Sequence, residues 1–259
     1  MDFLYNQEVS KFSKQDAIIA ICLFIYWVIY AFIEGMLRPI FGMSEEIYDI
    51  TRIVFAVFNI SIVFAIVILR KQGLGSIGLH KNRLWSAICL GLMFVPIAVI
   101  IRGILPGLVD DRVLYSLDSF AFIFVNTALL AVREDITMVG FIQTRIYGLV
   151  KNDNWAINIA AAMFAILHVP QQLVAGVPMG VINLIIWLLI CFFIHRAFVM
   201  LFKRYFSLIP VFIMHTAINF STSIWQEQGG IAFLFFAIFA FVFSVAVEVW
   251  YEKWNKKKS

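Results

Sequence analysis

Residues 120–149 read FAFIFVNTALLAVREDITMVGFIQTRIYGL, an apolar run with Arg133, Glu134 and Asp135 close to its centre. A helix of about 20 residues, at about 1.5 Å per residue, crosses the hydrocarbon core of a bilayer. This run is longer, so we expect a membrane helix that is tilted, broken or extended past the interface. Ionisable groups inside a span are costly and usually face the interior of a helix bundle. The three charges therefore mark this helix as a candidate functional element.

Seven further apolar runs predict an all-α, polytopic membrane protein of about eight transmembrane helices. They cover residues 17–37, 50–69, 84–101, 155–168, 181–202, 208–225 and 231–250. Hydrophobic residues make up 63% of the chain and charged residues only 14%, whereas a soluble domain has about 45–50% apolar residues. The runs leave no room for a separate soluble domain, so residues 1–259 are expected to form a single transmembrane domain.

The charges between the predicted helices indicate the orientation of the chain. The even-numbered loops and the C-terminal tail are basic, whereas the first loop is acidic and no odd-numbered loop is clearly basic. Basic loops face the cytoplasm, so we expect both termini there. The basic residues are Arg70, Lys71, Lys81, Arg83, Arg145, Lys151, Lys203, Arg204, Lys256, Lys257 and Lys258, and the acidic residues of the first loop are Glu45, Glu46 and Asp49.

The rest of the polar sequence gives little sign of other partners. The net charge of +4 follows from the loops, and no aromatic–basic interleaving suggests a nucleic-acid partner. Residues 1–15 are polar and the run after them lacks a small-x-small cleavage site, so no cleavable signal peptide is expected. The loop 169–180 contains Pro170 and Pro178 but no charge, which makes it a candidate re-entrant or cavity-lining segment.

Two histidines and an asparagine join the central charges as candidate site residues. His168 ends the fifth run, and His215 lies inside the seventh with Asn219 four residues on. This spacing puts His215 and Asn219 on one helix face. Simpler explanations exist for each: Arg133 could neutralise a neighbouring carboxylate, His168 could be an interfacial residue, and the pair could serve as helix–helix glue.

Together these residues are suited to water-mediated acyl chemistry. A desolvated Glu134 could act as general base toward water. His215, Asn219 or His168 could donate hydrogen bonds to the oxyanion that develops on an attacked carbonyl. No serine or cysteine pairs convincingly with a histidine, which argues against a covalent nucleophile. Two histidines and a glutamate could also bind catalytic zinc, but the helical His-Glu-x-x-His motif is absent, and we expect neither a metal nor another cofactor.

The three cysteines and the other two histidines have simpler interpretations. Cys22, Cys89 and Cys191 each lie in an apolar run and are expected to be buried small hydrophobes. His195 and Arg196, with the basic loop that follows, are expected to be anchors at the cytoplasmic interface. His80 is a loop residue without an evident partner.

Three short strings, taken in order, resemble the motifs of the CPBP family. This family comprises the type II CAAX prenyl endopeptidases and the bacteriocin-processing or Abi-type membrane proteins of bacteria. Its first motif, Glu-Glu-x-x-x-Arg, is read here from Glu134 and Asp135 to Val139, with Gly140 after it. The second, Phe-x-x-x-His, runs from Phe164 to His168. The third, His-x-x-x-Asn, runs from His215 to Asn219, and the resemblance covers roughly residues 115–225.

The resemblance implies a catalytic core over about residues 115–225. In that family the first glutamate is the base of a metal-independent intramembrane protease, and the histidines and asparagine assist the water or the oxyanion. These roles fall on Glu134, His168, His215 and Asn219, with Asp135, Phe164 and Gly140 in support.

Two positions depart from the first motif. Asp135 replaces the second glutamate and shortens its reach, and Val139 replaces the arginine. Arg133 lies about 100° away around the helix and Arg145 three turns along it, so neither replaces Val139 in place. Either Asp135 titrates to neutral, or the site has drifted from its catalytic form.

The sequence therefore predicts an endopeptidase in a bacterial cell membrane that cleaves a membrane-associated peptide or protein with a glutamate-activated water. A bacteriocin or signalling peptide is the expected kind of substrate, ahead of a prenylated one. The alternative is a non-catalytic protein of the same fold, such as a bacteriocin self-immunity protein or a scaffold. A transporter with a proton relay is a third possibility, although the sequence shows no internal repeat.

Overall fold

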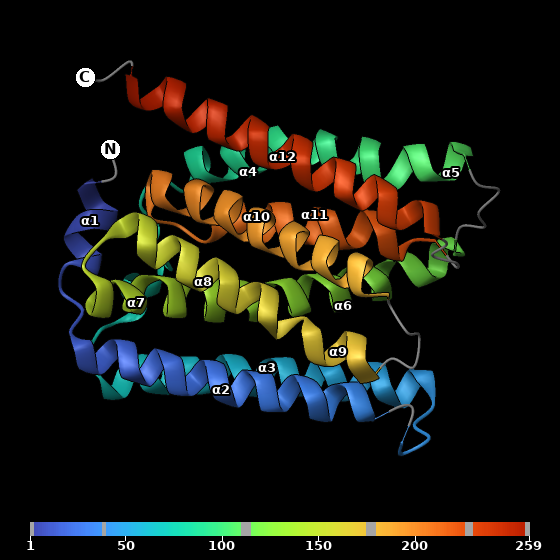
Figure 1. Cartoon of the computed structure of the whole chain (residues 1–259), viewed down its shortest axis with the longest axis horizontal. Coiled ribbons are helices and arrows are strands. Elements are labelled where there is room, and N and C mark those ends of the chain that lie inside the picture. Colours follow the sequence, from blue (N-terminus) through green and yellow to red (C-terminus); the bar gives the residue numbers. More distant parts are fainter. Residues whose placement is uncertain (1–2, 38–39, 110–114, 175–179, 226–229, 257–259) are drawn as a thin grey trace.

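The computed structural model describes residues 3–37, 40–109, 115–174, 180–225 and 230–256. Within these ranges the chain forms helices and turns without a β-strand, which confirms the all-α prediction (Figure 1). The helices are α1 (Phe3–Val9), α2 (Lys14–Met36), α3 (Glu45–Leu69), η1 (Leu74–Ile77), α4 (Leu84–Ala98), η2 (Val99–Ile104), α5 (Leu105–Val109), α6 (Leu117–Glu134), η3 (Asp135–Ile142), α7 (Gln143–Val150), α8 (Asp153–Leu167), α9 (Val169–Val174), α10 (Val181–Tyr205), α11 (Ile209–Ser223) and α12 (Gly230–Lys256).

Each of the eight predicted apolar runs is helical, and five helices are long and apolar enough to cross a membrane. These five are Lys14–Met36, Ile47–Leu69, Leu84–Val109, Val181–Tyr205 and Phe233–Trp254. The protein is thus a multi-pass membrane protein, while the count of eight crossings stays a prediction.

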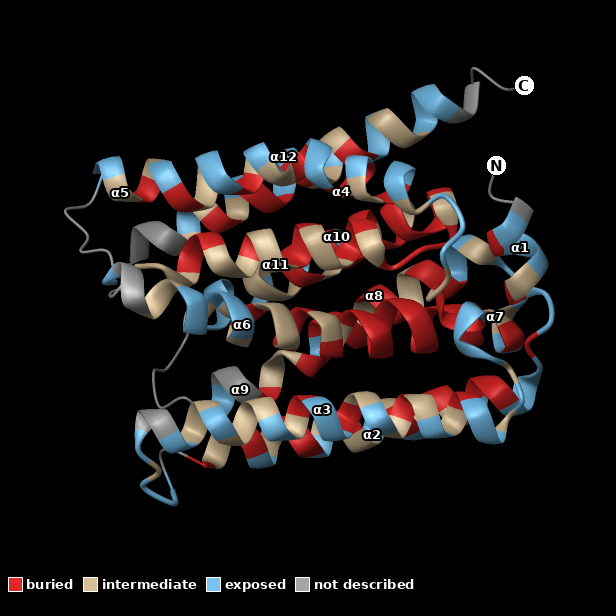
Figure 2. Cartoon of the chain, turned by 180° about the vertical axis from the view of Figure 1, so that it is seen from behind, coloured by how far each residue is buried: buried red, intermediate tan, exposed pale blue. Residues whose placement is uncertain are grey.

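Large apolar side chains are exposed on these helices, and Figure 2 shows exposed residues along α2, α3, α4 and α12. Such a surface suits lipid, because hydrocarbon replaces water around it. Cys22 and Cys89 lie on this surface, so the prediction that they are buried is wrong, whereas Cys191 is buried as expected.

The helices form a layered bundle. Figure 1 shows α2 and α3 along one side, α4, α5 and α12 along the opposite side, and the remaining long helices between them. The run that carries the central charges is one unbroken helix from Leu117 to Val150, in the interior of the bundle. This helix is not α-helical throughout, because residues 135–142 form a π-helix directly after Glu134.

The π-helix η3 is the most enclosed part of the chain. All of its residues are buried, and α2, α3, α8, α10 and η1 pack against it. Gly140 permits one of these contacts, because a Cβ there would come within 2.9 Å of the Ile77 carbonyl oxygen. π-Helical turns are rare and are frequent at functional sites. The charged residues at its start are therefore held in a rigid frame.

Arg145 ties this central helix to η1 rather than facing a loop. Its side chain is fully buried and donates to the Ser76 carbonyl at 3.0 Å, to Ser76 Oγ at 2.8 Å and to Gln72 Oε1 at 2.8 Å. The rings of Phe12 and Phe141 flank its guanidinium. Its assignment to a basic loop is therefore wrong, and its role is structural.

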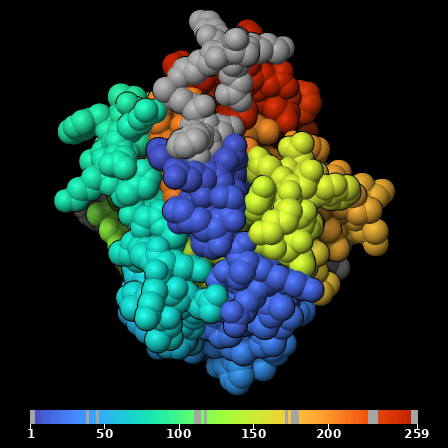
Figure 3. Space-filling view, turned by 90° about the vertical axis from the view of Figure 1, so that its left-hand side faces the viewer, coloured from blue at the N-terminus to red at the C-terminus, as the bar shows by residue number. Residues whose placement is uncertain are grey.

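The two ends of the bundle differ. α1 and the C-terminal end of α12 lie at the same end (Figure 1), and Figure 3 shows α1 filling the middle of that end, between the segment around η1 and the α7–α8 turn. Tyr5 of α1 is fully buried there, against the rings of Phe202 and Phe206. His80 also has a partner at this end, since its Nε2 bonds the Phe206 carbonyl at 2.5 Å. This end is closed, and the side facing the cytoplasm stays a prediction.

Candidate active site

Glu134 and Asp135 both face His215 of α11 at the junction between α6 and η3. His215 Nδ1 lies 2.8 Å from Asp135 Oδ1, and its Nε2 lies 3.8 Å from Glu134 Oε2. Asp135 is 1% exposed and His215 is 6% exposed. Asp135 is therefore not stranded by the loss of the motif arginine, because the imidazole of His215 is its partner.

The hydrogen bond to Asp135 fixes how the His215 ring is protonated. A carboxylate accepts, so Nδ1 carries the proton and donates it to Asp135. In the neutral ring, Nε2 is then an acceptor, and it becomes a donor only in the imidazolium form. The Phe198 ring, 5.0 Å away between centres, packs against the imidazole and holds its plane.

His168 reaches the same region from the end of α8. Its Nδ1 donates to the Phe164 carbonyl at 2.8 Å, which fixes this tautomer too. The Phe164 ring packs between His168, at 4.7 Å, and His195, at 5.0 Å. His168 and Glu134 line one small cavity, so the structure brings the second motif to the first.

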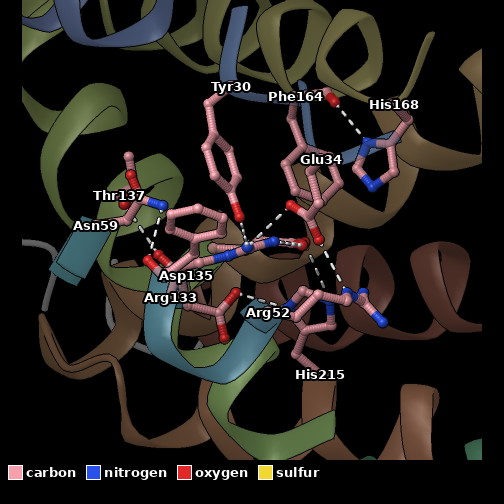
Figure 4. A network of polar contacts seen from close by, with 12 residues as sticks. Tyr30, Glu34, Arg52, Asn59, Arg133, Asp135, Thr137, Phe164, His168 and His215 are labelled. Atoms are coloured by element: carbon pink, nitrogen blue, oxygen red, sulfur yellow. Dashed lines mark hydrogen bonds and ion pairs between the residues drawn. The ribbon is translucent and has the colours of Figure 1, made fainter. Parts of the chain in front are cut away.

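A buried ion cluster holds Glu134 from its other side. Arg133 Nη2 lies 3.3 Å from Glu134 Oε1, and Arg133 Nη1 lies 3.3 Å from Glu34 Oε2 on α2. Arg52 of α3 donates to the other oxygen of Glu34 at 2.9 Å. Figure 4 shows Arg133, Glu34 and Arg52 converging with Tyr30, whose hydroxyl accepts from Arg133 at 3.2 Å.

With all of its carboxylates ionised, the cluster lacks one positive charge. Its two arginines face three carboxylates, those of Glu34, Glu134 and Asp135. One imidazolium would balance the remaining negative charge, and His215 touches two of the carboxylates. Uncompensated charge is expensive at membrane depth, so the arrangement favours a protonated His215.

Val139 is 1% exposed and belongs to the hydrophobic core, so it takes no part in the charge cluster. The cation beside Glu134 is Arg133 instead, on the adjacent position. Its guanidinium lies over the ring of Trp27 at 5.2 Å and reaches Glu34 on another helix. The cluster thus retains an arginine, although in a different place from that of the family motif.

Asn219 lies apart from this group. It lines a second, larger cavity of about 820 Å³, whose lining includes the beginnings of α3 and α6 and the end of α11, at the end of the bundle opposite α1 (Figure 1). Arg52 also lines this cavity while it binds Glu34, so it stands between the large cavity and the ion cluster. The other lining residues are Asp49, Ile50, Arg102, Tyr115, Ser119, Phe122, Ile123, Asn126, Thr127, Leu130, Thr222, Ser223 and Trp225.

The structure also describes His195, Gly140 and the possible metal ligands. His195 is fully buried with no hydrogen-bond partner at either ring nitrogen among the described residues, so its prediction as an interfacial anchor is wrong. Gly140 packs closely against Ile77 of η1 and does not lie beside the carboxylates. In the part of the chain that the structure describes, no three His, Cys, Asp or Glu side chains lie close enough together to hold a metal ion.

Sequence reasoning missed Glu34 and Arg52. Both lie inside predicted apolar runs, residues 17–37 and 50–69, but near their ends. The cost of a charge within a span is the signal that could have found them.

The family model described as type II CAAX prenyl endopeptidase Rce1-like matches residues 116–221. This match over residues 116–221 confirms the resemblance predicted from the three motifs. No curated protein and no solved structure matches the chain.

Proposed function

We propose that the protein is an intramembrane endopeptidase that hydrolyses a peptide bond with a water activated by Glu134. The observation that supports this most is the position of the Glu134 carboxylate, 3.8 Å from the Nε2 of a histidine that Asp135 orients. A carboxylate base beside a positioned imidazole is suited to general acid–base catalysis.

The chemistry proceeds in two steps. Glu134 takes one proton from water, and the hydroxide oxygen bonds to the carbonyl carbon of the scissile peptide. The tetrahedral oxyanion then collapses, the C–N bond breaks, and Glu134 passes its proton to the leaving amine. The products are a carboxylic acid and an amine, so atoms and charge balance without a covalent enzyme intermediate.

His215 and His168 are proposed to stabilise the oxyanion. Since each Nδ1 is committed to a fixed acceptor, Nε2 is the nitrogen left for the substrate, and it donates to the oxyanion when the ring is in its imidazolium form. Positioned donors of this kind lower the barrier by a few kcal/mol each, about 10²–10³ in rate. Asn219 is proposed to bind the peptide chain from the wall of the large cavity.

A membrane-associated peptide or protein is the proposed substrate. The large cavity lies within the range of about 300–1,000 Å³ typical of ligand pockets, and its polar lining can bind a peptide backbone. A bacterial cell membrane, and a bacteriocin or signalling peptide as substrate, remain part of this proposal.

The test is cleavage by purified protein in phosphatidylcholine nanodiscs. A pooled library of N-acylated peptides is the substrate, and mass spectrometry identifies the products. We expect wild type to cleave, Glu134→Gln to be inactive and properly folded, and Glu248→Gln, a carboxylate on the exposed part of α12, to be unaffected. Full turnover by Glu134→Gln would refute the mechanism.

The rival is a non-catalytic protein of the same fold, which the buried Val139 favours. It predicts that wild type cleaves nothing and that immunity or signalling in cells survives Glu134→Ala and His168→Ala. A gain of cleavage in Val139→Arg would identify a degraded protease site.

A further inference from the structure

Arg102 is a cation inside a membrane helix, and it has no carboxylate partner in the part of the chain that the structure describes. It lies in η2, within the apolar segment Leu84–Val109 that is long enough to cross the membrane. Its guanidinium packs over the Phe236 ring at 3.9 Å from the centre, and it forms no ion pair with any carboxylate among the described residues. It also lines the large cavity, together with Asn219.

Other arginines within the bundle are satisfied in a way that Arg102 is not. Arg52 and Arg133 share Glu34, and Arg145 makes several hydrogen bonds to η1 and its neighbours. An arginine at membrane depth is costly and is usually paired with an anion or placed in a water-filled cavity. Arg102 lines the large cavity, where a ligand can supply an anion for it.

The surroundings of Arg102 suit a ligand of limited size. The Trp225 indole donates to the Gly103 carbonyl at 3.1 Å and so is fixed beside Arg102 on the same cavity wall. Asp49, the acidic residue of the lining, comes from α3, on the opposite side of the bundle (Figure 1). Arg52, on the same α3 wall as Asp49, is already paired with Glu34, so Arg102 is the arginine of the lining that is left to bind an added anion.

We propose that Arg102 binds a carboxylate of the peptide held in the large cavity and so fixes the direction in which the peptide lies. This inference rests on the proposed function, because it assigns a specificity determinant to that substrate. Guanidinium groups bind carboxylates through two parallel hydrogen bonds. Asn219, one helical turn from His215, lines the same cavity, so a peptide anchored at Arg102 extends toward the catalytic group.

Binding is measured with the Glu134→Gln protein in phosphatidylcholine nanodiscs, so that no cleavage is needed for a result. The probes are N-dansylated apolar hexapeptides with a free C-terminal carboxylate, the same peptides with a C-terminal amide, and amidated peptides with one internal glutamate. The Glu134→Gln protein is compared with three double variants that also carry Arg102→Gln, Arg102→Lys or Arg196→Gln. Arg196 lies on α10, outside the cavity, so Arg196→Gln is the matched control.

The free carboxylate is expected to improve affinity about tenfold to a hundredfold over the amide, as a charge-assisted bond does. Arg102→Gln should remove this preference, Arg102→Lys should keep part of it, and Arg196→Gln should leave it intact. Recovery of affinity by the internal glutamate would assign the anchor to an acidic side chain, and failure to recover would assign it to the C-terminus. If Arg102→Gln does not fold, the proposal is tested by the carboxylate–amide comparison and by the reduced preference expected of Arg102→Lys.

Equal binding of the carboxylate and amide peptides, or no binding, overturns the proposal. The experiment is repeated in phosphatidylglycerol nanodiscs, and abolition of the preference there would show that Arg102 holds a lipid phosphate instead. A carboxylate preference in a protein that cleaves no peptide would refute the proposed function while leaving this binding site in place.

Discussion

His215 Nδ1 and Asp135 Oδ1 lie 2.8 Å apart and join two residues separated by 80 positions in the chain. The contact gives the second acidic residue of the first motif a definite structural partner. It also directs Nε2 of the ring toward Glu134, which lies on the adjacent helical position. The pair thus resembles the orienting arrangement of an acid and a histidine in hydrolases, where the acid sets the tautomer and stabilises the charged ring.

Asp135→Asn is expected to lower kcat roughly a hundredfold or more with little change in KM. The carboxamide oxygen can still accept from Nδ1, but it no longer stabilises the imidazolium. Cleavage kinetics in nanodiscs check this, with Asp135→Glu as the variant that keeps the charge. A loss of the same size in Asp135→Glu would point to packing rather than charge.

Glu34→Gln is expected to destabilise the fold by about 3–5 kcal/mol, because it leaves Arg133 and Arg52 without their shared buried anion. The measurement is thermal unfolding in detergent, with Glu248→Gln as control. Since Glu34 and Arg133 are in contact, Glu34→Gln and Arg133→Gln together should cost less than the sum of the two. Additive losses would contradict the ion pair.

Gly140→Ala is expected to cost about 1–3 kcal/mol, the usual range for overpacking, because its Cβ would lie 2.9 Å from the Ile77 carbonyl oxygen. Gly75→Ala is the matched control, since an added Cβ there meets nothing within 4 Å. Equal unfolding temperatures for the two variants would show that η1 can move away from η3 freely.

His195→Phe is expected to keep cleavage activity and to unfold at the same temperature as wild type or higher. The change retains a ring against Phe164 and removes two buried nitrogens that have no partner among the described residues. His195→Ala, which leaves a void, should be less stable. Loss of cleavage in a well-folded His195→Phe would instead assign this histidine to the chemistry.

The helices were predictable because each long apolar run can bury its backbone polar groups in a membrane only as helix. The candidate residues of the three motifs were predictable as well, and Glu134, Asp135 and His215 do meet. The partner of Arg133 on another helix was not, because Glu34 lies 99 residues away and only the packing of α2 against η3 and α7 brings it near.

The π-helix could not be predicted from the sequence either. Residues 135–142 read DITMVGFI, apolar enough to be helical, but nothing in this composition separates a π-helix from an α-helix. The angle of about 100° per residue, assumed for an α-helix when Arg145 was placed relative to Glu134, therefore does not hold across residues 135–142. His195 was misplaced for a related reason, since a histidine beside a basic loop is indistinguishable in sequence from one that turns inward.

The closed end of the bundle, where α1 lies between the segment around η1 and the α7–α8 turn, has a consequence for the route of the substrate. The large cavity lies toward the other end, where the lining residues of α3, α6 and α11 are found. With both termini in the cytoplasm, as the loop charges predict, that other end faces outward. A peptide would then meet Glu134 only after its export, and the protein would act as a maturation step on the outer side of the membrane.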